Sequence, residues 1–246
     1  MSGDDRFQWN SAGISHTGKV RSINQDAFAV RPDVGLWVVA DGMGGHDAGD
    51  LASHAIVESL NQILPQQRLS TFIDQVEDRL IEVNRSLITE AAERTEPTTI
   101  GSTVVAMLAV RNYCACLWAG DSRAYLLRDG QMQLMTQDHS QVEELIEQGL
   151  LLREDADRHP AANVITRAVG ATEQLFVDVD LMELQDHDRI LLCTDGLLKE
   201  VSQAEIARAL QQGGCQESCD ELLELALSRG ARDNVTVVVI DFKKLT

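Results

Sequence analysis

The amino-acid sequence predicts an α+β protein in which antiparallel β-sheets pack face to face and helices cover the outer faces. Three observations lead to this expectation: short apolar runs rich in β-branched residues, pairs of amphipathic segments with helical spacing, and hairpin signals between the runs. Groups of strands that alternate with pairs of helices are typical of such layered folds. No linker rich in Pro, Gly or Ser divides the 246 residues, so we expect one domain over residues 1–246.

The first third of the chain is expected to form three strands followed by two helices. Apolar runs bounded by turn residues predict strands over 7–15, 26–30 and 35–40. Apolar residues at helical spacing predict the two helices, and each is amphipathic enough to cover another layer. These residues are Leu51, Ala52, Ala55, Ile56, Leu60 and Ile63 in the first helix, and Phe72, Val76, Leu80, Val83, Leu87 and Ala91 in the second.

Four apolar runs in the middle of the chain predict one antiparallel meander. The dipeptide Asp129-Gly130 is typical of a tight hairpin, and Gly120-Asp121-Ser122 forms another turn. A short helix is expected over 141–148, and the polar segment after it has weak periodicity. We therefore expect a mobile flap over residues 141–165. The four runs cover residues 102–110, 113–119, 124–127 and 131–134.

The last third repeats the alternation, with strands expected over 176–184, 189–194 and 235–242. Two helices separate the second of these strands from the third. Ser202 and Glu205 have the spacing of a capping box, which places the start of the first helix. Ser218 and Glu221 have the same spacing and place the start of the second helix. Glycines after each apolar pattern mark the two helix ends.

The charge balance excludes two classes of partner. Against 21 Lys and Arg stand 39 Asp and Glu, a net charge of -18 that repels nucleic acid and anionic membrane surfaces. The start of the chain lacks the features of a signal peptide, and no run reaches the roughly 18 to 20 apolar residues of a membrane helix. We expect a cytoplasmic protein without a nucleic-acid or membrane partner.

The cysteines favour a reducing compartment, because their number is odd and they are too sparse for a disulfide scaffold. Cys114, Cys116 and Cys193 lie in apolar strand runs. Cys215 and Cys219 are four residues apart on a predicted helix, but no second pair or nearby histidine completes a zinc site. We interpret all five as small buried apolar residues.

Three aspartates carry the strongest functional signal. Asp41 and Asp195 directly follow apolar strand runs, and Asp233 directly precedes one. A carboxylate at the mouth of a buried strand is rigidly held but costly to bury alone. Three such groups that converge repel one another unless a cation lies between them, and hard divalent metal ions are the usual solution. The sequence therefore predicts a metal-dependent enzyme.

Seven short motifs follow one another in order over residues 21–236, nearly the whole chain. In this order the set resembles the bacterial type of the metal-dependent serine/threonine protein phosphatases of type 2C, the PPM family. The resemblance implies a four-layer α/β/β/α sandwich of two central antiparallel β-sheets flanked by helix pairs. The motifs are Arg21-Ser22-Ile23-Asn24-Gln25-Asp26, Val39-Ala40-Asp41-Gly42-Met43-Gly44-Gly45, Gly101-Ser102-Thr103, Gly120-Asp121-Ser122-Arg123, Asp138-His139-Ser140, Thr194-Asp195-Gly196 and Arg232-Asp233-Asn234-Val235-Thr236.

The resemblance also implies which residues bind metal ions. Asp41 is expected to bridge two ions, and the carbonyl group of Gly42 is expected to bind the first. Asp195 and Asp233 are expected to complete the second site. Asp121 resembles the ligand of a third ion, which it would share with Asp195. Oxygen ligands of this kind suit Mn²⁺ or Mg²⁺ rather than zinc, so the expected cofactor is two or three of these ions.

The resemblance also implies the substrate and the roles of the remaining site residues. Arg21 matches the phosphate-binding arginine of the family and would hold the phosphoryl group through a bidentate contact. Asp26 would hydrogen-bond water bound to a metal ion. Two metal ions can orient a water for in-line attack on phosphoserine or phosphothreonine without a covalent intermediate. By family analogy we expect a monomeric phosphoprotein phosphatase that opposes a cytoplasmic Ser/Thr kinase.

One position departs from the family pattern. Eukaryotic relatives carry a histidine two residues after the bridging aspartate, where this chain has Met43, so the general acid is unassigned. His46 lies three residues further on, but a loop histidine is more often a packing residue. His139 is expected to fix its loop through hydrogen bonds. Arg123 is expected to pair with a neighbouring carboxylate.

Three other functions fit the sequence less well. A cysteine phosphatase needs an arginine six residues after its nucleophilic cysteine. Six residues after Cys193 this chain has Lys199. A two-metal hydrolase acting on another phosphoester, such as a nuclease, also uses clustered acids, but the charge of -18 argues against a nucleic-acid substrate. A catalytically weak phosphoprotein-binding module of the same fold is the alternative from a different class. It predicts lost metal ligands, and none of the expected carboxylates is missing.

Overall fold

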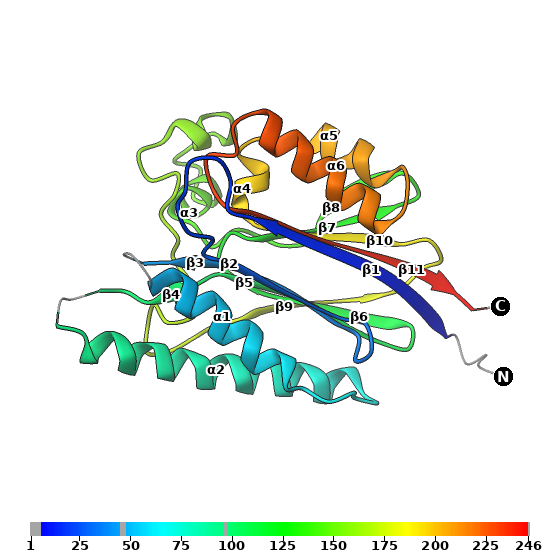
Figure 1. Ribbon diagram of the computed structural model, residues 1–246, viewed down its shortest axis with the longest axis horizontal. Coiled ribbons are helices and arrows are strands. Elements are labelled where there is room, and N and C mark those ends of the chain that lie inside the picture. The colour runs from blue at the N-terminus through cyan, green and yellow to red at the C-terminus, as the bar shows by residue number, and fades with distance from the viewer. Residues whose placement is uncertain (1–5, 45–47, 96–97, 246) are drawn as a thin grey trace.

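The computed structural model describes residues 6–44, 48–95 and 98–245. In this part of the chain two antiparallel sheets lie face to face, with helices on both outer faces (Figure 1). The predicted four-layer α/β/β/α sandwich is therefore confirmed. Both ends of the described chain lie at the same end of the sandwich (Figure 1).

Sheet A contains the first and last strands of the chain, which pair with each other along their full length. The strand order is β1-β11-β10-β7-β8, and every neighbouring pair is antiparallel. The bounds are β1 Phe7–His16, β11 Val235–Lys244, β10 Arg189–Cys193, β7 Arg123–Arg128 and β8 Gln131–Leu134.

Sheet B has the order β2-β3-β5-β6-β9, and the two-residue β4 pairs with the end of β3. Its central strands are buried on both faces because one face meets sheet A and the other meets helices. The bounds are β2 Asp26–Arg31, β3 Leu36–Met43, β4 Gly101–Ser102, β5 Val104–Val110, β6 Tyr113–Ala119 and β9 Asp178–Glu183.

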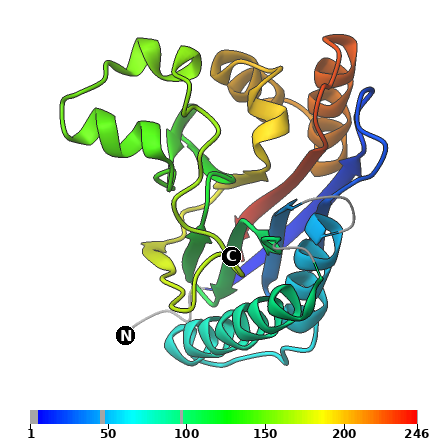
Figure 2. The same cartoon turned by 90° about the vertical axis from the view of Figure 1, so that its left-hand side faces the viewer.

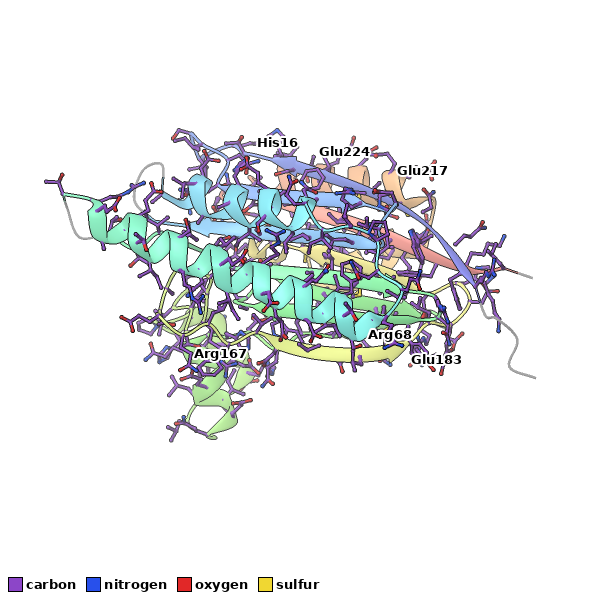
Figure 3. The ribbon with its side chains drawn as sticks, turned by 90° about the horizontal axis from the view of Figure 1, so that it is seen from below. His16, Arg68, Arg167, Glu183, Glu217 and Glu224 are labelled. Carbon is purple, nitrogen blue, oxygen red and sulfur yellow. The ribbon has the colours of Figure 1, made fainter. Side chains whose placement is uncertain are left out.

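Helices cover each sheet from outside. The helices α1, Ala48–Asn61, and α2, Leu69–Glu93, pack on sheet B, and α2 crosses in front of the strands when the molecule is seen from below (Figure 3). On sheet A lie α4, Asp195–Leu198, α5, Gln203–Leu210, and α6, Cys215–Ser228. No helix in the described ranges is both long and apolar enough to cross a membrane.

A separate arm projects from the sandwich between β8 and β9 (Figure 2). It contains α3, Gln141–Glu147, and a 3₁₀-helix, η1, Arg153–Arg158. At the base of the arm, an antiparallel bridge between Ser140 and Ile165 joins the segment that enters the arm to the segment that leaves it. The predicted helix over 141–148 is confirmed. The bridge falls at the ends of the predicted flap.

The predicted single meander is wrong. Strands β5 and β6 form a hairpin in sheet B, whereas β7 and β8 form a hairpin in sheet A. The chain crosses between the sheets at Gly120-Asp121-Ser122, where Gly120 has a φ of 119°. Each hairpin forms between neighbouring segments of the chain. Which sheet a hairpin joins depends on contacts with residues that are remote in sequence. At Asp129-Gly130 both residues have positive φ, 51° and 75°, which confirms the predicted tight hairpin.

The predicted start of the last helix is wrong, whereas that of the helix before it is confirmed. The box of Ser202 and Glu205 lies at the start of α5. However, α6 begins at Cys215, and the carboxylate of Glu217 accepts a hydrogen bond of 2.6 Å from the N–H of Gly214. Ser218 is therefore inside the helix, where its buried hydroxyl donates to the carbonyl of Ala209 at 3.0 Å.

The five cysteines are buried and carry free thiols. Burial raises the pKa of each thiol, and the pKa of Cys193 reaches about 12. Cys215 and Cys219 donate weakly to backbone carbonyls of β1. The interpretation as small buried apolar residues is confirmed.

Candidate metal centre

Strands of both sheets bring the predicted acidic residues to one end of the sandwich. Asp41 lies in β3 of sheet B, directly opposite Asp26 of the neighbouring β2. In sheet A, Cys193 of β10 pairs with Val237 of the antiparallel β11. Asp195, just after β10, and Asp233, just before β11, therefore lie at the same end of the sheet. The alternation of strands in the sequence thus gathers carboxylates from distant positions.

The electrostatics of Asp41 show that these carboxylates interact. Its pKa lies well above the ordinary value, first because the group is buried and then because Asp26, Asp195, Asp121 and Asp233 repel its charge. The backbone of Asp41 is fixed on both sides. Its N–H donates to Thr103 Oγ1 at 3.0 Å, and its carbonyl accepts from Ser102 Oγ at 2.9 Å.

Asp26 is buried beneath the cluster, with 3% of its surface exposed. Its Oδ2 accepts hydrogen bonds from Thr194 Oγ1 at 3.0 Å and Thr236 Oγ1 at 2.7 Å. Its Oδ1 is buried and has no hydrogen-bond partner in the part of the chain that the structure describes. Burial raises the pKa of Asp26 to about 7, although the two threonine bonds act in the opposite direction.

Two cations lie against the outer carboxylates. The Nζ atom of Lys199 is 2.5 Å from Asp195 Oδ2 and 3.0 Å from Asp233 Oδ2. Arg21 contacts Asp233 with Nε at 2.8 Å and Nη2 at 3.1 Å. Burial favours the protonated form of Asp233, but the bonds from Arg21 and Lys199 prevail and hold its pKa below the ordinary value. For Asp195 burial prevails, so its pKa is raised.

Asp121 joins the cluster from the crossing between the sheets. It lines a pocket of about 470 Å³ together with Asp195 and Lys199. Burial, followed by repulsion from Asp195 and Asp138, raises the pKa of Asp121 to about 7. Asp121 and Asp195 thus line the same pocket.

The gathered oxygen donors fit a hard divalent cation. Several carboxylates repel one another in a buried place, and Asp26 Oδ1 lacks a partner that a bound water would supply. Within the described residues no three histidine, cysteine, aspartate or glutamate side chains already converge on one point as a closed ligand set. At Asp195 and Asp233, Lys199 and Arg21 contact the oxygens that would have to turn toward an ion.

Gly42 allows the backbone to pass close to α1. A Cβ atom at Gly42 would lie 2.0 Å from the carbonyl oxygen of Gly49, so no larger residue fits. Conversely, a Cβ atom at Gly49 would lie 2.7 Å from the carbonyl oxygen of Gly42. This oxygen therefore lies beside the first turn of α1, and its expected role as a metal ligand stays a prediction.

Three supporting residues were not assigned a role from the sequence. The side chain of Asn234 fixes the segment that carries Arg21, because its Oδ1 accepts from the N–H of Gln25 and its Nδ2 donates to the carbonyls of Thr17 and Ile23. Thr236 holds Asp26. Lys199 lies four residues after Asp195, a spacing that favours contact between the two side chains on a helix.

The expected structural roles of the flanking residues are confirmed. Arg123 forms a bidentate pair with Asp138, at 2.8 and 2.7 Å. His139 accepts from the N–H of Gly120 through Nδ1 at 3.1 Å, contacts Asp178 through Nε2 and stacks on Trp118. His46 lies in the segment 45–47, outside the described residues.

Comparison with known proteins assigns this chain to a family. The model of the family described as protein phosphatase 2C matches residues 12–232. The chain belongs to the protein phosphatase 2C family. The serine/threonine phosphatase Stp of Listeria innocua is 33% identical to this phosphatase over 235 residues, which cover 91% of this chain and 92% of that protein.

Solved structures agree with the fold of the phosphatase. PppA of Pseudomonas aeruginosa, described as a key regulatory component of T6SS, has a TM-score of 0.90 and 39% identity, covering 98% of this chain and 100% of that chain. The catalytic domain of the phosphatase PstP, solved in complex with 2 manganese ions, has a TM-score of 0.86 and 33% identity, covering 96% and 99%. This chain is a metal-dependent serine/threonine protein phosphatase of the bacterial 2C type.

Proposed function

We propose that Asp41, Asp195 and Asp233 hold two divalent cations with which this phosphatase hydrolyses phosphoserine and phosphothreonine in proteins. The observation that supports the assignment is that strands of both sheets bring the three aspartates to one end of the sandwich, where burial and the neighbouring carboxylates raise the pKa of Asp41. The carbonyl of Gly42 is proposed as a further ligand. The two manganese ions in the PstP catalytic domain support the number of ions and make Mn²⁺ a suitable cofactor, with Mg²⁺ as the other candidate.

When bound, two such ions would polarise a water for attack and stabilise the charge on the phosphoryl oxygens. The residues of the chain orient the other partners. Arg21 has a side chain that is 53% exposed, and its contact with Asp233 holds the guanidinium at the rim of the cluster. We assign it the substrate phosphoryl group, which suits the planar fork of arginine donors. Asp26 Oδ1 is assigned a hydrogen bond from a water at the ions.

A third cation is proposed between Asp121 and Asp195. Support comes from the pocket that both residues line and from their mutual repulsion, which favours an added positive charge. Asp121 lies in the crossing between the two sheets, so this site would be built from a loop rather than from a strand. Its loss should affect the enzyme less than loss of Asp41.

Residues 141–165 are proposed as a flap that selects substrates within a single domain spanning residues 1–246. The bridge between Ser140 and Ile165 supports this boundary, and the arm projects beside the pocket that contains Asp121. The arm is acidic at Glu143 and Glu144 in the first turn of α3. Its place beside this pocket supports a contact with protein substrates rather than with the phosphoryl group.

The cellular role is proposed from charge and family. We assign the phosphatase to the cytoplasm, where it would act as a monomer on phosphoproteins and oppose a Ser/Thr kinase. The net charge of -18 supports the absence of nucleic-acid and membrane partners.

The assignment is tested by hydrolysis of a phosphothreonine peptide and a small aryl phosphate with and without Mn²⁺. Wild-type protein should release phosphate only with the metal, and Asp41→Ala or Asp233→Ala should reduce turnover at least about a hundredfold. Glu224→Ala, on the exposed face of α6 and outside the proposed flap, should behave like wild type. A folded, metal-loaded protein that binds phosphopeptides but never hydrolyses them would favour the binding module. Hydrolysis of the aryl phosphate alone would favour a hydrolase for another phosphoester.

A further inference from the structure

We propose that Lys199 is an internal counter-cation of the metal centre, whose ammonium group competes with a divalent ion for Asp195 and Asp233 and weakens binding of that ion. The proposal rests on the function assigned above and goes beyond it. It concerns a residue that chelates nothing itself. It predicts that this enzyme binds metal less tightly than its carboxylates alone would allow.

The position of Lys199 is fixed by the short helix α4. This helix begins at Asp195, and the N–H of Lys199 donates to the carbonyl of Asp195 at 2.9 Å. The side chain of Lys199 therefore returns over the same turn, where its Nζ lies 2.5 Å from Asp195 Oδ2 and 3.0 Å from Asp233 Oδ2. Among the described residues, it is the basic side chain whose ion pairs join both carboxylates.

These contacts and a metal ion use the same oxygens. A hard divalent ion binds carboxylate oxygens at about 2.0 to 2.6 Å, close to where the ammonium already lies. The ammonium group of Lys199 and an ion on the same oxygens would therefore lie close together. Their positive charges repel each other strongly where little solvent screens them. The side chains of Lys199, Asp195 and Asp233 are 35%, 21% and 22% exposed, so screening by water is incomplete.

Lys199 has a place to go when an ion binds. Its side chain lines the pocket of about 470 Å³ that also contains Asp121, Asp138 and Ser202. A lysine has a flexible stem and an ammonium group without fixed geometry, so it can leave two carboxylates and face a third. Arg21 differs, because its ion pair is with Asp233 and not with Asp195.

Two simpler roles make opposite predictions. If Lys199 only stabilises the turn of α4 as an i,i+4 partner of Asp195, its removal leaves metal affinity unchanged. If it holds the two carboxylates in place for the ion, its removal weakens metal binding. Competition alone predicts that removal of the charge strengthens binding and destabilises the metal-free protein.

The test is a calorimetric titration of chelator-treated protein with Mn²⁺, combined with thermal unfolding in the presence of the chelator. Lys199→Met retains the apolar stem and removes the charge. We expect its dissociation constant for Mn²⁺ to fall about tenfold and its metal-free Tm to fall by several degrees, because two charge-assisted contacts are lost. Lys199→Arg keeps the charge and should remain near wild type in both measurements.

The matched control is Lys243→Met, an exposed lysine at the opposite end of β11 from Asp233. It should change neither quantity. If Lys199→Met does not fold, Lys199→Gln replaces it. An unchanged or weaker affinity for Mn²⁺ in the folded variant would overturn the proposal.

A further variant separates this proposal from the assignment beneath it. Mn²⁺ binding by wild type that is lost in Asp233→Ala supports the metal centre itself. With that result, an unchanged Lys199→Met affinity removes only the role of Lys199. If wild-type protein binds no Mn²⁺, or if Asp233→Ala binds it as well as wild type, both the metal assignment and the competition are wrong.

Discussion

At the scale of single residues, the metal centre concentrates negative charge in a buried place. Asp26 and Asp121 each have a pKa raised to about 7, mainly by burial, and the pKa of Asp41 lies well above its ordinary value. These shifts measure how much the folded chain disfavours the charged carboxylates. The metal-free phosphatase should therefore lose stability as the carboxylates ionise.

Asp26 gives this effect a definite sign. Its pKa is higher in the folded state than in the unfolded state, so the folded protein binds more protons between about pH 4 and 7. In the presence of a chelator, the contribution of Asp26 to the free energy of unfolding should be greatest below about pH 4. This contribution should be lost as the pH rises through about 7. For a group this buried the effect is at most roughly 4 kcal/mol.

Urea unfolding at several pH values in the presence of a chelator measures this contribution. Asp26→Asn should flatten the pH dependence in this window without removing it, since Asp121 titrates with the same sign. The exposed Asp155→Asn should reproduce the wild-type slope. If Asp26→Asn has the wild-type slope, the raised pKa is wrong.

The sequence identifies Arg21 and the residues that lie at strand ends, but not Lys199, which pairs with both Asp195 and Asp233. Asp41, Asp195 and Asp233 were predictable because a charged residue beside a buried strand is costly unless a ligand or a partner compensates it. Lys199 has no such marker. A lysine on a predicted helix is ordinarily a solvated surface residue, and only the folded chain brings it against Asp233.

At the scale of secondary-structure elements, Ser218 connects α6 to the end of α5. Its buried hydroxyl donates to the carbonyl of Ala209 and accepts from Arg189 Nη1. The carbonyls in the last turn of a helix lack partners within the helix, so this bond satisfies one of them. Its loss leaves a buried acceptor unpaired.

Ser218→Ala should therefore lower the free energy of unfolding by about 1 to 2 kcal/mol while leaving Mn²⁺-dependent turnover intact. Chemical denaturation with activity measured on the same samples checks both statements. Ser228→Ala, an exposed serine at the end of the same helix, should stay within about 0.5 kcal/mol of wild type. Equal effects of the two substitutions would contradict the role of the buried bond.

The errors in the sequence prediction also belong to this scale. The spacing of Ser218 and Glu221 matches a capping box, yet Gly214 and Glu217 provide an earlier helix start that this pattern does not distinguish. The meander prediction rests on successive apolar runs that are joined by short turn signals. Which sheet each strand joins depends on the faces that meet in the core, so the crossing at Gly120-Asp121-Ser122 could not be predicted from local spacing.

At the scale of the whole molecule, the fold was predictable because seven motifs, spread in order over residues 21–236, resemble those of one family. Hydrophobic periodicity indicates the alternation of strands and helix pairs, and the layers follow from the need to bury each apolar face. What the periodicity does not contain is the order of strands in each sheet. The pairing of β1 with β11 joins the two ends of the chain, and no local signal marks it.

Metal binding should stabilise the entire phosphatase by mass action. At a free Mn²⁺ concentration about 100 times the dissociation constant, one site adds roughly 2.7 kcal/mol, which corresponds to a rise in Tm of about 5 to 11 °C for a domain of this size. Thermal unfolding against Mn²⁺ concentration measures the shift. Asp233→Ala should show little of it, and Mn²⁺-induced stabilisation equal to wild type in that variant would place the ion elsewhere.

The proposed ligands come from different layers: Asp41 belongs to sheet B, and Asp195 and Asp233 flank strands of sheet A. An ion shared among them would act as a cross-link between two sheets that otherwise meet mainly through apolar side chains in their common core. Chelation would then do more than stop turnover. It would leave the two sheets joined at this end by hydrogen bonds such as those from Thr194 and Thr236 to Asp26, whereas packed aromatic rings join them at the opposite end.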